Sequence, residues 1–324
     1  MITEGNERSE FRPKMIDRIR GIRNCFRNYY SDLIRYSRFR LIRPTDKGSF
    51  YFYFEPNKKH PGIADRMKSI VSAYNIANAN GLRFYLSWET PYRLFDYFEP
   101  RFDMEFAYDN LKLSLVNTRL FEERFSDTLI PLDPSKQYIC YRYQGHNMPR
   151  VLPNTGRKWC DVFHEMFRPS AKLESAYKAL AIPEHTYVSC HLRFVNALEK
   201  FENTFFDNHL KTEGERNALI ARCKKGIQEI IDVNPGKDVY VFSDSKIFLN
   251  SLSEMPVKVL PSDNIGHVSE GTNENGILKS FLDLYVMSKG DAVYRFCTLE
   301  LYSISHYALL AATIGDIPFY DQTI

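Results

Sequence analysis

The sequence predicts an α/β protein of two domains, each a parallel sheet with helices on its faces. Between residues 49 and 88 a strand, a helix and a second strand follow one another, and beyond Pro183 strand and helix alternate four times. This order predicts parallel sheets, because parallel strands need a crossover connection that is usually a helix. The length of 324 residues agrees, since one domain takes about 150 residues. The second half in particular is typical of a doubly wound, Rossmann-like domain.

The composition is that of a globular protein in water. The aromatic share of 15% supplies ample material for a core. No run of about 18 apolar residues is present, and the N-terminus lacks the basic start and apolar stretch of a secretory signal. We therefore expect no spanning helix and a cytoplasmic location. The six cysteines form no C-x-x-C pair, which argues against zinc and redox motifs and favours free thiols.

Residues 1–47 are expected to form a basic helical extension. They hold twelve Lys and Arg against six Asp and Glu, whereas the rest of the chain has 31 against 34. Apolar residues at helical spacing between Met15 and Leu41, with arginines interleaved, predict an amphipathic helix. The simpler interpretation is a surface helix packed on the body. The alternative is a peripheral anchor on the anionic inner face of the membrane.

The first domain is expected to cover residues 48–170. An aromatic run of strand length is followed by apolar residues at three- and four-residue intervals, and Gly81 ends that helical pattern. Ser170 is a candidate cap for the helix that begins the next domain. The predicted elements are strand 49–54, helix 63–80, strand 82–88 and short strands near 113–116 and 138–141.

The second domain is expected to cover residues 171–324. Its apolar runs are of strand length, and amphipathic stretches of helical length separate them. The predicted strands are 186–193, 238–242, 257–260, 292–296 and 317–320. The predicted helices are 213–232, a short one ending at residue 252, 277–288 and 300–314.

Polar residues follow the ends of several predicted strands, where open parallel sheets bind ligands. At the first such place, Gly62 allows a tight turn, and Asp65 and Arg66 lie in the first turn of the helix. A plain strand-to-helix turn explains these residues equally well. The chain has neither the G-x-G-x-x-G nor the G-x-x-x-x-G-K-[ST] pattern, which argues against hydride transfer and P-loop chemistry.

At the second place, the predicted strand 186–193 ends in His191-Leu192-Arg193. An arginine there can place its planar fork on phosphate oxygens. The alternative is a salt-bridged arginine beside a satisfied core histidine.

Hydroxyl groups mark two further strand ends. Ser243-Asp244-Ser245 suits ribose and phosphate contacts, although simple helix capping explains it as well. Ser303 and Ser305 are expected early in the helix 300–314, where hydroxyls and free N–H groups can cradle a phosphate.

In this order the motifs resemble the fucosyltransferase clan of GT-B glycosyltransferases, which includes nodulation α-1,6-fucosyltransferases, bacterial α-1,2-fucosyltransferases and protein O-fucosyltransferases. The segment from Trp88 to Pro100 also looks like the first domain of that clan. The resemblance covers about residues 50–324 and implies two Rossmann-like domains facing a central cleft. The matching residues are Gly62, Asp65 and Arg66; Phe167-Arg168-Pro169-Ser170; His191-Leu192-Arg193; Ser243-Asp244-Ser245; and Ser303 to Ala308.

The resemblance implies a sugar donor such as GDP-fucose, a glycan acceptor, and an inverting reaction without a metal ion or other cofactor. The chain has no D-x-D beside an apolar strand, the usual metal-holding pattern of the other main glycosyltransferase fold. Arg193 would bind the β-phosphate of GDP and stabilise the leaving pyrophosphate. The implied catalytic residues are Arg193 and Asp65, and the implied donor-binding residues are Gly62, Arg66, His191, Asn196, Ser243, Asp244, Ser245, Ser303 and Ser305.

The chain also departs from the clan. After H-x-R the clan often has R-G-D or a similar polar turn, whereas this chain has Phe194-Val195-Asn196, which leaves the identity of the sugar donor open. Asp65, Glu199 and Glu202 are the candidates for the base that takes the proton of the acceptor. The alternatives are a GT-B transferase with another nucleotide sugar, and an inactive GT-B scaffold that binds a polyanion or a protein. No nucleic acid partner is expected.

Overall fold

The computed structural model describes residues 36–42, 44–56, 58, 60–123, 127–143, 148–199, 208–261 and 273–324. The basic amphipathic helix predicted between Met15 and Leu41 lies almost wholly outside the described residues, as does Glu202. Across the described ranges, no helix is both long and apolar enough to cross a bilayer.

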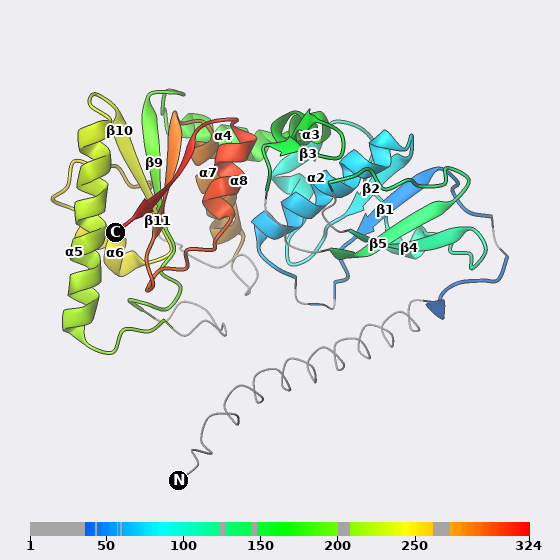
Figure 1. The fold of residues 1–324 in the computed structure, drawn as a ribbon, viewed down its shortest axis with the longest axis horizontal. Helices are drawn as coiled ribbons and strands as arrows, with labels where there is room; N and C mark the ends of the chain where they lie inside the picture. The colour runs from blue at the N-terminus through cyan, green and yellow to red at the C-terminus, as the bar shows by residue number, and fades with distance from the viewer. Residues whose placement is uncertain are drawn as a thin grey trace, which may run out of the picture.

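Four strands of the described chain form the first sheet, in the order β2-β1-β5-β4, and all neighbours are parallel. These strands are β1 (Ser49–Tyr53), β2 (Arg83–Ser87), β4 (Thr118–Glu123) and β5 (Gln137–Tyr143). Helix α2 (Ile63–Ala79) joins β1 to β2 and packs on the sheet (Figure 1). The strand–helix–strand unit predicted at the start of this half is confirmed.

A second parallel sheet of four described strands has the order β10-β9-β11-β12. Its strands are β9 (Tyr187–Leu192), β10 (Asp238–Ser243), β11 (Ala292–Cys297) and β12 (Phe319–Thr323). The helices of this half are α5 (Glu213–Val233), α6 (Lys246–Ser251), α7 (Glu274–Ser288) and α8 (Tyr307–Ile314). The predicted α/β class with parallel sheets is therefore confirmed.

Shorter elements also form between β2 and β9, and β3 pairs with β8 in antiparallel fashion. They are η1 (Leu94–Asp96), β3 (Phe98–Pro100), η2 (Tyr108–Asn110), β6 (Val151–Leu152), β7 (Arg157–Lys158), α3 (Trp159–Met166), β8 (Phe167–Pro169) and α4 (Ala171–Ala179).

Local sequence signals explain where the helices begin and end. Gly81, with a φ of 68°, takes the left-handed conformation after α2 that glycine adopts without a Cβ clash. At the start of α5, the Thr212 hydroxyl accepts the Glu215 N–H at 3.2 Å while the Glu215 carboxylate accepts the Thr212 N–H at 2.9 Å. The predicted cap at Ser170 is confirmed, because its hydroxyl accepts the N–H of Leu173 at 3.2 Å.

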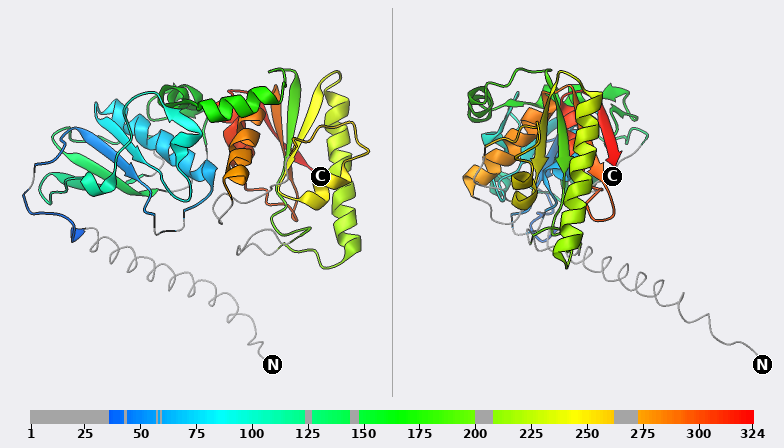
Figure 2. Two further views of the ribbon diagram at one scale, coloured as in Figure 1. Left: turned by 180° about the vertical axis from the view of Figure 1, so that it is seen from behind. Right: turned by 90° about the vertical axis from the view of Figure 1, so that its left-hand side faces the viewer.

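Buried apolar side chains form a continuous core from the first sheet to α7 and α8, which lie between the two sheets in Figure 1 and in the left view of Figure 2. Tyr97, beside η1, stacks on Phe281 of α7 with ring centroids 4.3 Å apart. Nε2 of His164 in α3 lies 2.9 Å from the carbonyl oxygen of Ile314 at the end of α8. These contacts join the elements around the first sheet to α7 and α8 of the second half.

Three predicted elements differ in the structure. Residues 257–260 form only one bridge, between Lys258 and Tyr240, because Pro256 and Pro261 on either side lack the N–H needed to extend a ladder. Helix 300–314 begins only at Tyr307, since the loop before it uses its hydroxyl groups to bond its own backbone. The strand expected near 113–116 forms instead at β4 (Thr118–Glu123).

Candidate active site

Arg193 lies just beyond the carboxyl end of β9, and Asp244 directly follows the neighbouring strand β10. Nη1 of Arg193 is 3.1 Å from Oδ2 of Asp244, whose side chain is only 5% exposed, against 19% for Arg193. Because β9 and β10 are parallel neighbours, their carboxyl ends meet at one edge of the sheet. The buried carboxylate therefore holds the guanidinium at the edge where open parallel sheets bind ligands.

The same carboxylate orders the turn after Arg193. Asp244 accepts hydrogen bonds from the Phe194 N–H at 2.7 Å and from the Val195 N–H at 2.8 Å. Val195 has a φ of 57°, a left-handed conformation that costs a residue with a Cβ roughly 1–2 kcal/mol. Nδ2 of Asn208 also donates to the Phe194 carbonyl at 2.6 Å. These bonds hold a strained backbone, a feature that is concentrated at functional sites.

His191, near the end of β9, is a buried and neutral imidazole. Its side chain is 5% exposed, and its Nδ1 atom has no hydrogen-bond partner among the described residues. Burial, followed by the positive charges of Arg193 and Arg295, lowers the pKa of His191 to about 3. The ring centroid lies 5.5 Å from that of Tyr307, the first residue of α8. The site therefore contains a buried imidazole nitrogen that has no hydrogen-bond partner among the described residues.

Arg295 lies opposite His191 in the neighbouring strand β11. Its Nε and Nη2 atoms donate to the Asp321 carboxylate at 2.7 and 2.9 Å. Its Nη1 atom donates to the carbonyl of Ser305 at 2.8 Å. Arg295 thus ties the loop that precedes α8 to the second sheet, beside His191.

Asp65 and Lys68, on the first two turns of α2, contact the residue before α8. Lys68 Nζ lies 2.7 Å from Asp65 Oδ1 and 2.9 Å from Nδ1 of His306. Burial acts to raise the pKa of Asp65, but hydrogen bonds from His306 and Lys68 outweigh it and bring the pKa below its ordinary value. Asp65 is therefore ionised at neutral pH. This cluster joins the helix of the first sheet to the loop of the second.

Gly62 caps α2 without a side chain. Its φ of −63° is open to any residue, so the turn does not require glycine, contrary to the expectation of a tight turn. A Cβ placed on Gly62 would meet no atom within 4 Å. The first turn of α2 therefore keeps N–H groups that no side chain caps, next to Asp65.

Arg66, the next residue of α2, is 2% exposed and has other partners. Its Nε and Nη1 atoms donate to the carbonyls of Pro61 and Thr90, each at 2.8 Å. The guanidinium lies 4.8 Å from the Trp88 ring centroid and also faces Phe54. In the described structure Arg66 stabilises the turn before α2, and its assignment to the sugar donor stays a prediction.

Ser243, Ser245 and Glu199 have structural partners at the start of α6. The Ser245 hydroxyl accepts the Phe248 N–H at 3.2 Å and donates to the Glu199 carboxylate at 2.8 Å. The Ser243 hydroxyl accepts the Ser245 N–H at 3.2 Å. These contacts are those of helix capping. Glu199 is engaged in the cap, and so makes a poor candidate base.

Asn196, Ser303 and Ser305 lie in the two loops beside Arg193. The Asn196 N–H donates to Asn208 Oδ1 at 3.2 Å. The Ser303 hydroxyl donates to the Thr298 carbonyl at 2.9 Å and so closes its own loop. The sequence predicted that both serines lie early in a helix. That prediction is wrong, because α8 begins after them at Tyr307.

The structure thus brings Arg193 to Asp244, and it places Asp65 against Lys68 and His306. The His191 ring lies beside Tyr307, the residue after His306. Sequence reasoning missed Lys68, His306 and Arg295. Lys68 follows Asp65 by three residues, and His306 lies within the matching segment Ser303 to Ala308. Only the fold shows that Lys68 and His306 are in contact. Among the described residues, no three His, Cys, Asp or Glu side chains are grouped closely enough to hold a metal ion.

No protein-family model and no curated protein sequence matches the chain. Solved structures do match it. The structure of NodZ, an alpha-1,6-fucosyltransferase, soaked with GDP-fucose is 14% identical with a TM-score of 0.53, and the match covers 82% of this chain and 92% of NodZ. NodZ from Bradyrhizobium gives the same identity and coverage with a TM-score of 0.56. A variant of FUT1 from Arabidopsis thaliana in complex with GDP is 12% identical with a TM-score of 0.53, over 86% of this chain and 72% of FUT1. The chain therefore shares its fold with the fucosyltransferase clan whose motifs its sequence resembles.

Proposed function

We propose that the chain is a glycosyltransferase that moves fucose from GDP-fucose to a bacterial surface glycan, in an inverting reaction without a metal ion. The observation that carries the proposal is the contact between Arg193 and Asp244 at the carboxyl edge of the second sheet. Departure of GDP develops negative charge on the β-phosphate. A guanidinium already held in position stabilises that charge most in the transition state. The fold shared with NodZ, whose structure was solved after soaking with GDP-fucose, supports this choice of sugar donor.

The other groups of the site fit the same reaction. Neutral His191 offers a hydrogen-bonding nitrogen without adding charge, and Arg295 beside it contributes a positive field. The uncapped N–H groups at Gly62 suit a phosphate oxygen at the start of α2. Asp244 acts as a positioning residue, since its oxygens are taken up by Arg193 and by the turn that follows it.

Asp65 is the proposed base. In an inverting transfer, the acceptor oxygen bonds to the anomeric carbon as the bond to GDP breaks, and the hydroxyl proton passes to the base. The lowered pKa of Asp65 makes it a weak base. The proton therefore moves late, after the new bond has made the acceptor oxygen acidic.

We assign residues 48–170 to the acceptor-side domain and 171–324 to the domain that binds the nucleotide sugar. Residues 1–47 are assigned to a basic extension that contacts the inner face of the membrane. The protein would then act in the cytoplasm as a peripheral membrane enzyme. The helix cap at Ser170 supports the boundary, since α4 begins there and leads into the second sheet.

Thermal shift measurements with GDP, UDP and dTDP, each with and without EDTA, test the proposal. A ligand at about 100 Kd stabilises the folded protein by about 2.7 kcal/mol. We expect this stabilisation from GDP, unchanged by EDTA, and none from UDP or dTDP. Equal stabilisation by UDP would assign another nucleotide sugar. No stabilisation by any nucleotide would favour the inactive scaffold.

A further inference from the structure

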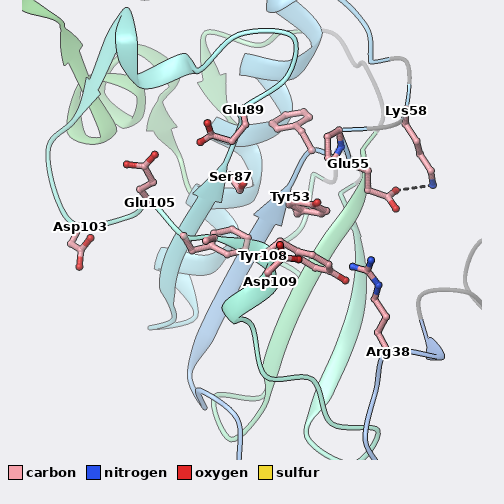
Figure 3. Close-up of a pocket in the computed structure, with 14 residues that line it drawn as sticks. Arg38, Tyr53, Glu55, Lys58, Ser87, Glu89, Asp103, Glu105, Tyr108 and Asp109 are labelled. Carbon is pink, nitrogen blue, oxygen red and sulfur yellow. Dashed lines mark ion pairs between the residues drawn. The ribbon is translucent and has the colours of Figure 1, made fainter.

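A cavity of about 830 Å³ opens at the carboxyl ends of β1 and β2 (Figure 3). Tyr53 and Ser87, which pair in the parallel register of these two strands, lie on its wall together with Glu89. The loop from residue 103 to 109 forms the opposite side. None of these side chains belongs to the cluster around Arg193. The cavity is therefore a second candidate binding site, at the edge where parallel sheets bind ligands.

The cavity presents an aromatic surface. The rings of Tyr53 and Tyr108 stack with centroids 4.2 Å apart and an interplanar angle of 13°. The hydroxyl of Tyr108 lies 2.6 Å from that of Tyr141, which fixes the pair against the sheet. Phe106 lies beside Tyr53, with ring centroids 6.3 Å apart. Aromatic faces attract both the apolar face of a sugar ring and a positive charge.

The cavity is also acidic, since five carboxylates and two cations line it. Both cations have partners: Lys58 pairs with Glu55 at 2.7 Å, and Arg38 lies over the Tyr108 ring at 5.1 Å. A further cation, Arg93, donates to both oxygens of Glu105. Partial burial, followed by the negative charge of Glu105, raises the pKa of Glu89. The carboxylates are Glu55, Glu89, Asp103, Glu105 and Asp109.

Three polar side chains of the cavity have no hydrogen bond or ion pair with a described residue. Ser87 is only 4% exposed, and no described residue hydrogen-bonds its hydroxyl, although that hydroxyl belongs to the cavity wall. Asp103 and Asp109 likewise have no ion pair or hydrogen bond with a described residue. A buried hydroxyl without a partner is costly unless a ligand or water satisfies it. These groups are placed to hold a ligand that donates hydrogen bonds and carries positive charge.

The cavity adjoins the start of α2. Phe54 lines the cavity and packs on Trp88, with ring centroids 4.9 Å apart. The guanidinium of Arg66 lies 4.8 Å from the Trp88 ring centroid and 5.7 Å from that of Phe54. Arg66 follows Asp65 directly in α2. Phe54 therefore links the wall of the cavity to the first turn of α2, which carries the proposed base.

We propose that this cavity binds an amino-sugar residue of the acceptor glycan, one that carries a free ammonium group. The inference rests on the proposed function, because it names the class of acceptor. The sugar ring lies against the aromatic wall of Tyr53, Phe106 and Tyr108. The carboxylates of Asp103 and Asp109 bind the ammonium group, and Ser87 hydrogen-bonds a sugar hydroxyl. A chelated metal ion fits less well, since the described carboxylates are too dispersed to surround one.

Calorimetric titration of the full chain tests the inference with three disaccharides of the same β-1,4 linkage. They are the disaccharides of glucosamine, of N-acetylglucosamine and of glucose, used at a pH at which the amines are protonated. We expect the glucosamine disaccharide to bind most tightly. Asp103→Asn with Asp109→Asn should weaken it about tenfold, as expected for the loss of two exposed charge contacts. The matched control is Asp127→Asn, which neutralises an exposed carboxylate outside the cavity.

Titration of the same samples with GDP separates this inference from the proposed function. Preference for the charged disaccharide, lost in the paired variant and kept in the control, supports the inference. Equal binding of all three disaccharides, or no effect of the paired variant, overturns it. If GDP binds but no disaccharide does, the inference is overturned and the proposed function stands. If the charged disaccharide binds but GDP does not, the cavity is not shown to hold an acceptor, and that role is overturned.

Discussion

The carboxylate of Asp244 contacts Arg193 at 3.1 Å and, at the same time, two consecutive backbone N–H groups of the turn after β9. One buried side chain therefore orients the guanidinium and holds the strained backbone at Val195. Residues that act as such a unit lose function together when one is changed. This relationship makes Arg193 and Asp244 the first positions to test.

Arg193→Ala and Arg193→Lys are both expected to lower kcat for transfer from GDP-fucose by about 10²–10³. Lysine keeps the charge but lacks the planar fork that can contact Asp244 and a phosphate together. Steady-state assays of GDP release measure the effect. Arg222→Ala is the control, because Arg222 pairs with Glu300 on the exposed surface. Transfer at the wild-type rate by folded Arg193→Ala would end the proposed mechanism.

Asp244→Asn is expected to lower both stability and turnover. The amide keeps the shape of the carboxylate but loses its charge and one of its acceptor oxygens, and a buried group left unsatisfied costs about 1–3 kcal/mol. Urea unfolding and turnover are measured on Asp244→Asn, Arg193→Lys and the double variant. We expect the two losses in turnover to be clearly less than additive. Simple additivity would show that the two residues act separately.

His191 is expected to make the folded protein sensitive to acid. Its pKa is about 3 in the folded state against 6.5 in the unfolded chain, so below pH 6.5 only the unfolded chain takes up the proton. The stability associated with the neutral imidazole is present above pH 6.5 and is lost as the pH falls toward 3. The slope is about 1.4 kcal/mol per pH unit. Urea unfolding at several pH values should show that His191→Asn lacks this part of the slope. An identical pH dependence in wild type and variant would contradict the burial of a neutral His191.

Asp65→Asn is expected to lower kcat by about 10²–10⁴, the usual contribution of a general base. GDP binding should hardly change, because Asp65 contacts Lys68 and His306 rather than Arg193. Turnover and GDP titration are measured side by side. Asp161→Asn is the matched control, since Asp161 also lies in the first turn of a helix but outside the site. Unchanged turnover in Asp65→Asn would remove it from the mechanism.

Residues 1–35 are expected to strengthen binding to anionic vesicles. The wider segment 1–47 has an excess of six positive charges, and each Lys or Arg near an anionic leaflet contributes about 1 kcal/mol. Deletion stops at residue 35 because Phe39 is buried in a cluster with Tyr51 of β1 and the Arg40 N–H donates to the Leu113 carbonyl at 3.1 Å. Co-sedimentation should show salt-sensitive binding that the deletion abolishes. Equal binding by the truncated chain would favour the ordinary surface helix.

Much of the fold was predictable because its signals are local. The aromatic run at β1, the apolar spacing of α2 and the cap at Ser170 each depend on residues within a few positions of one another. The predicted strand at 257–260 failed because two prolines and an edge position limit it to one bridge. The predicted helix at 300–306 failed because the Tyr302 N–H bonds the Arg193 carbonyl at 2.8 Å, a partner more than 100 residues away.

In the candidate site, too, local features were predictable and contacts between distant residues were not. Local patterns in the sequence were enough to predict the α/β class, the strand ends that carry His191, Arg193 and Asp244, and the resemblance to the fucosyltransferase clan. The contact between Lys68 and His306, 238 residues further along the chain, became visible only in the folded protein. The physical reason is that strand ends and helix starts follow from local pattern, whereas the partners of a buried charge depend on which surfaces pack together.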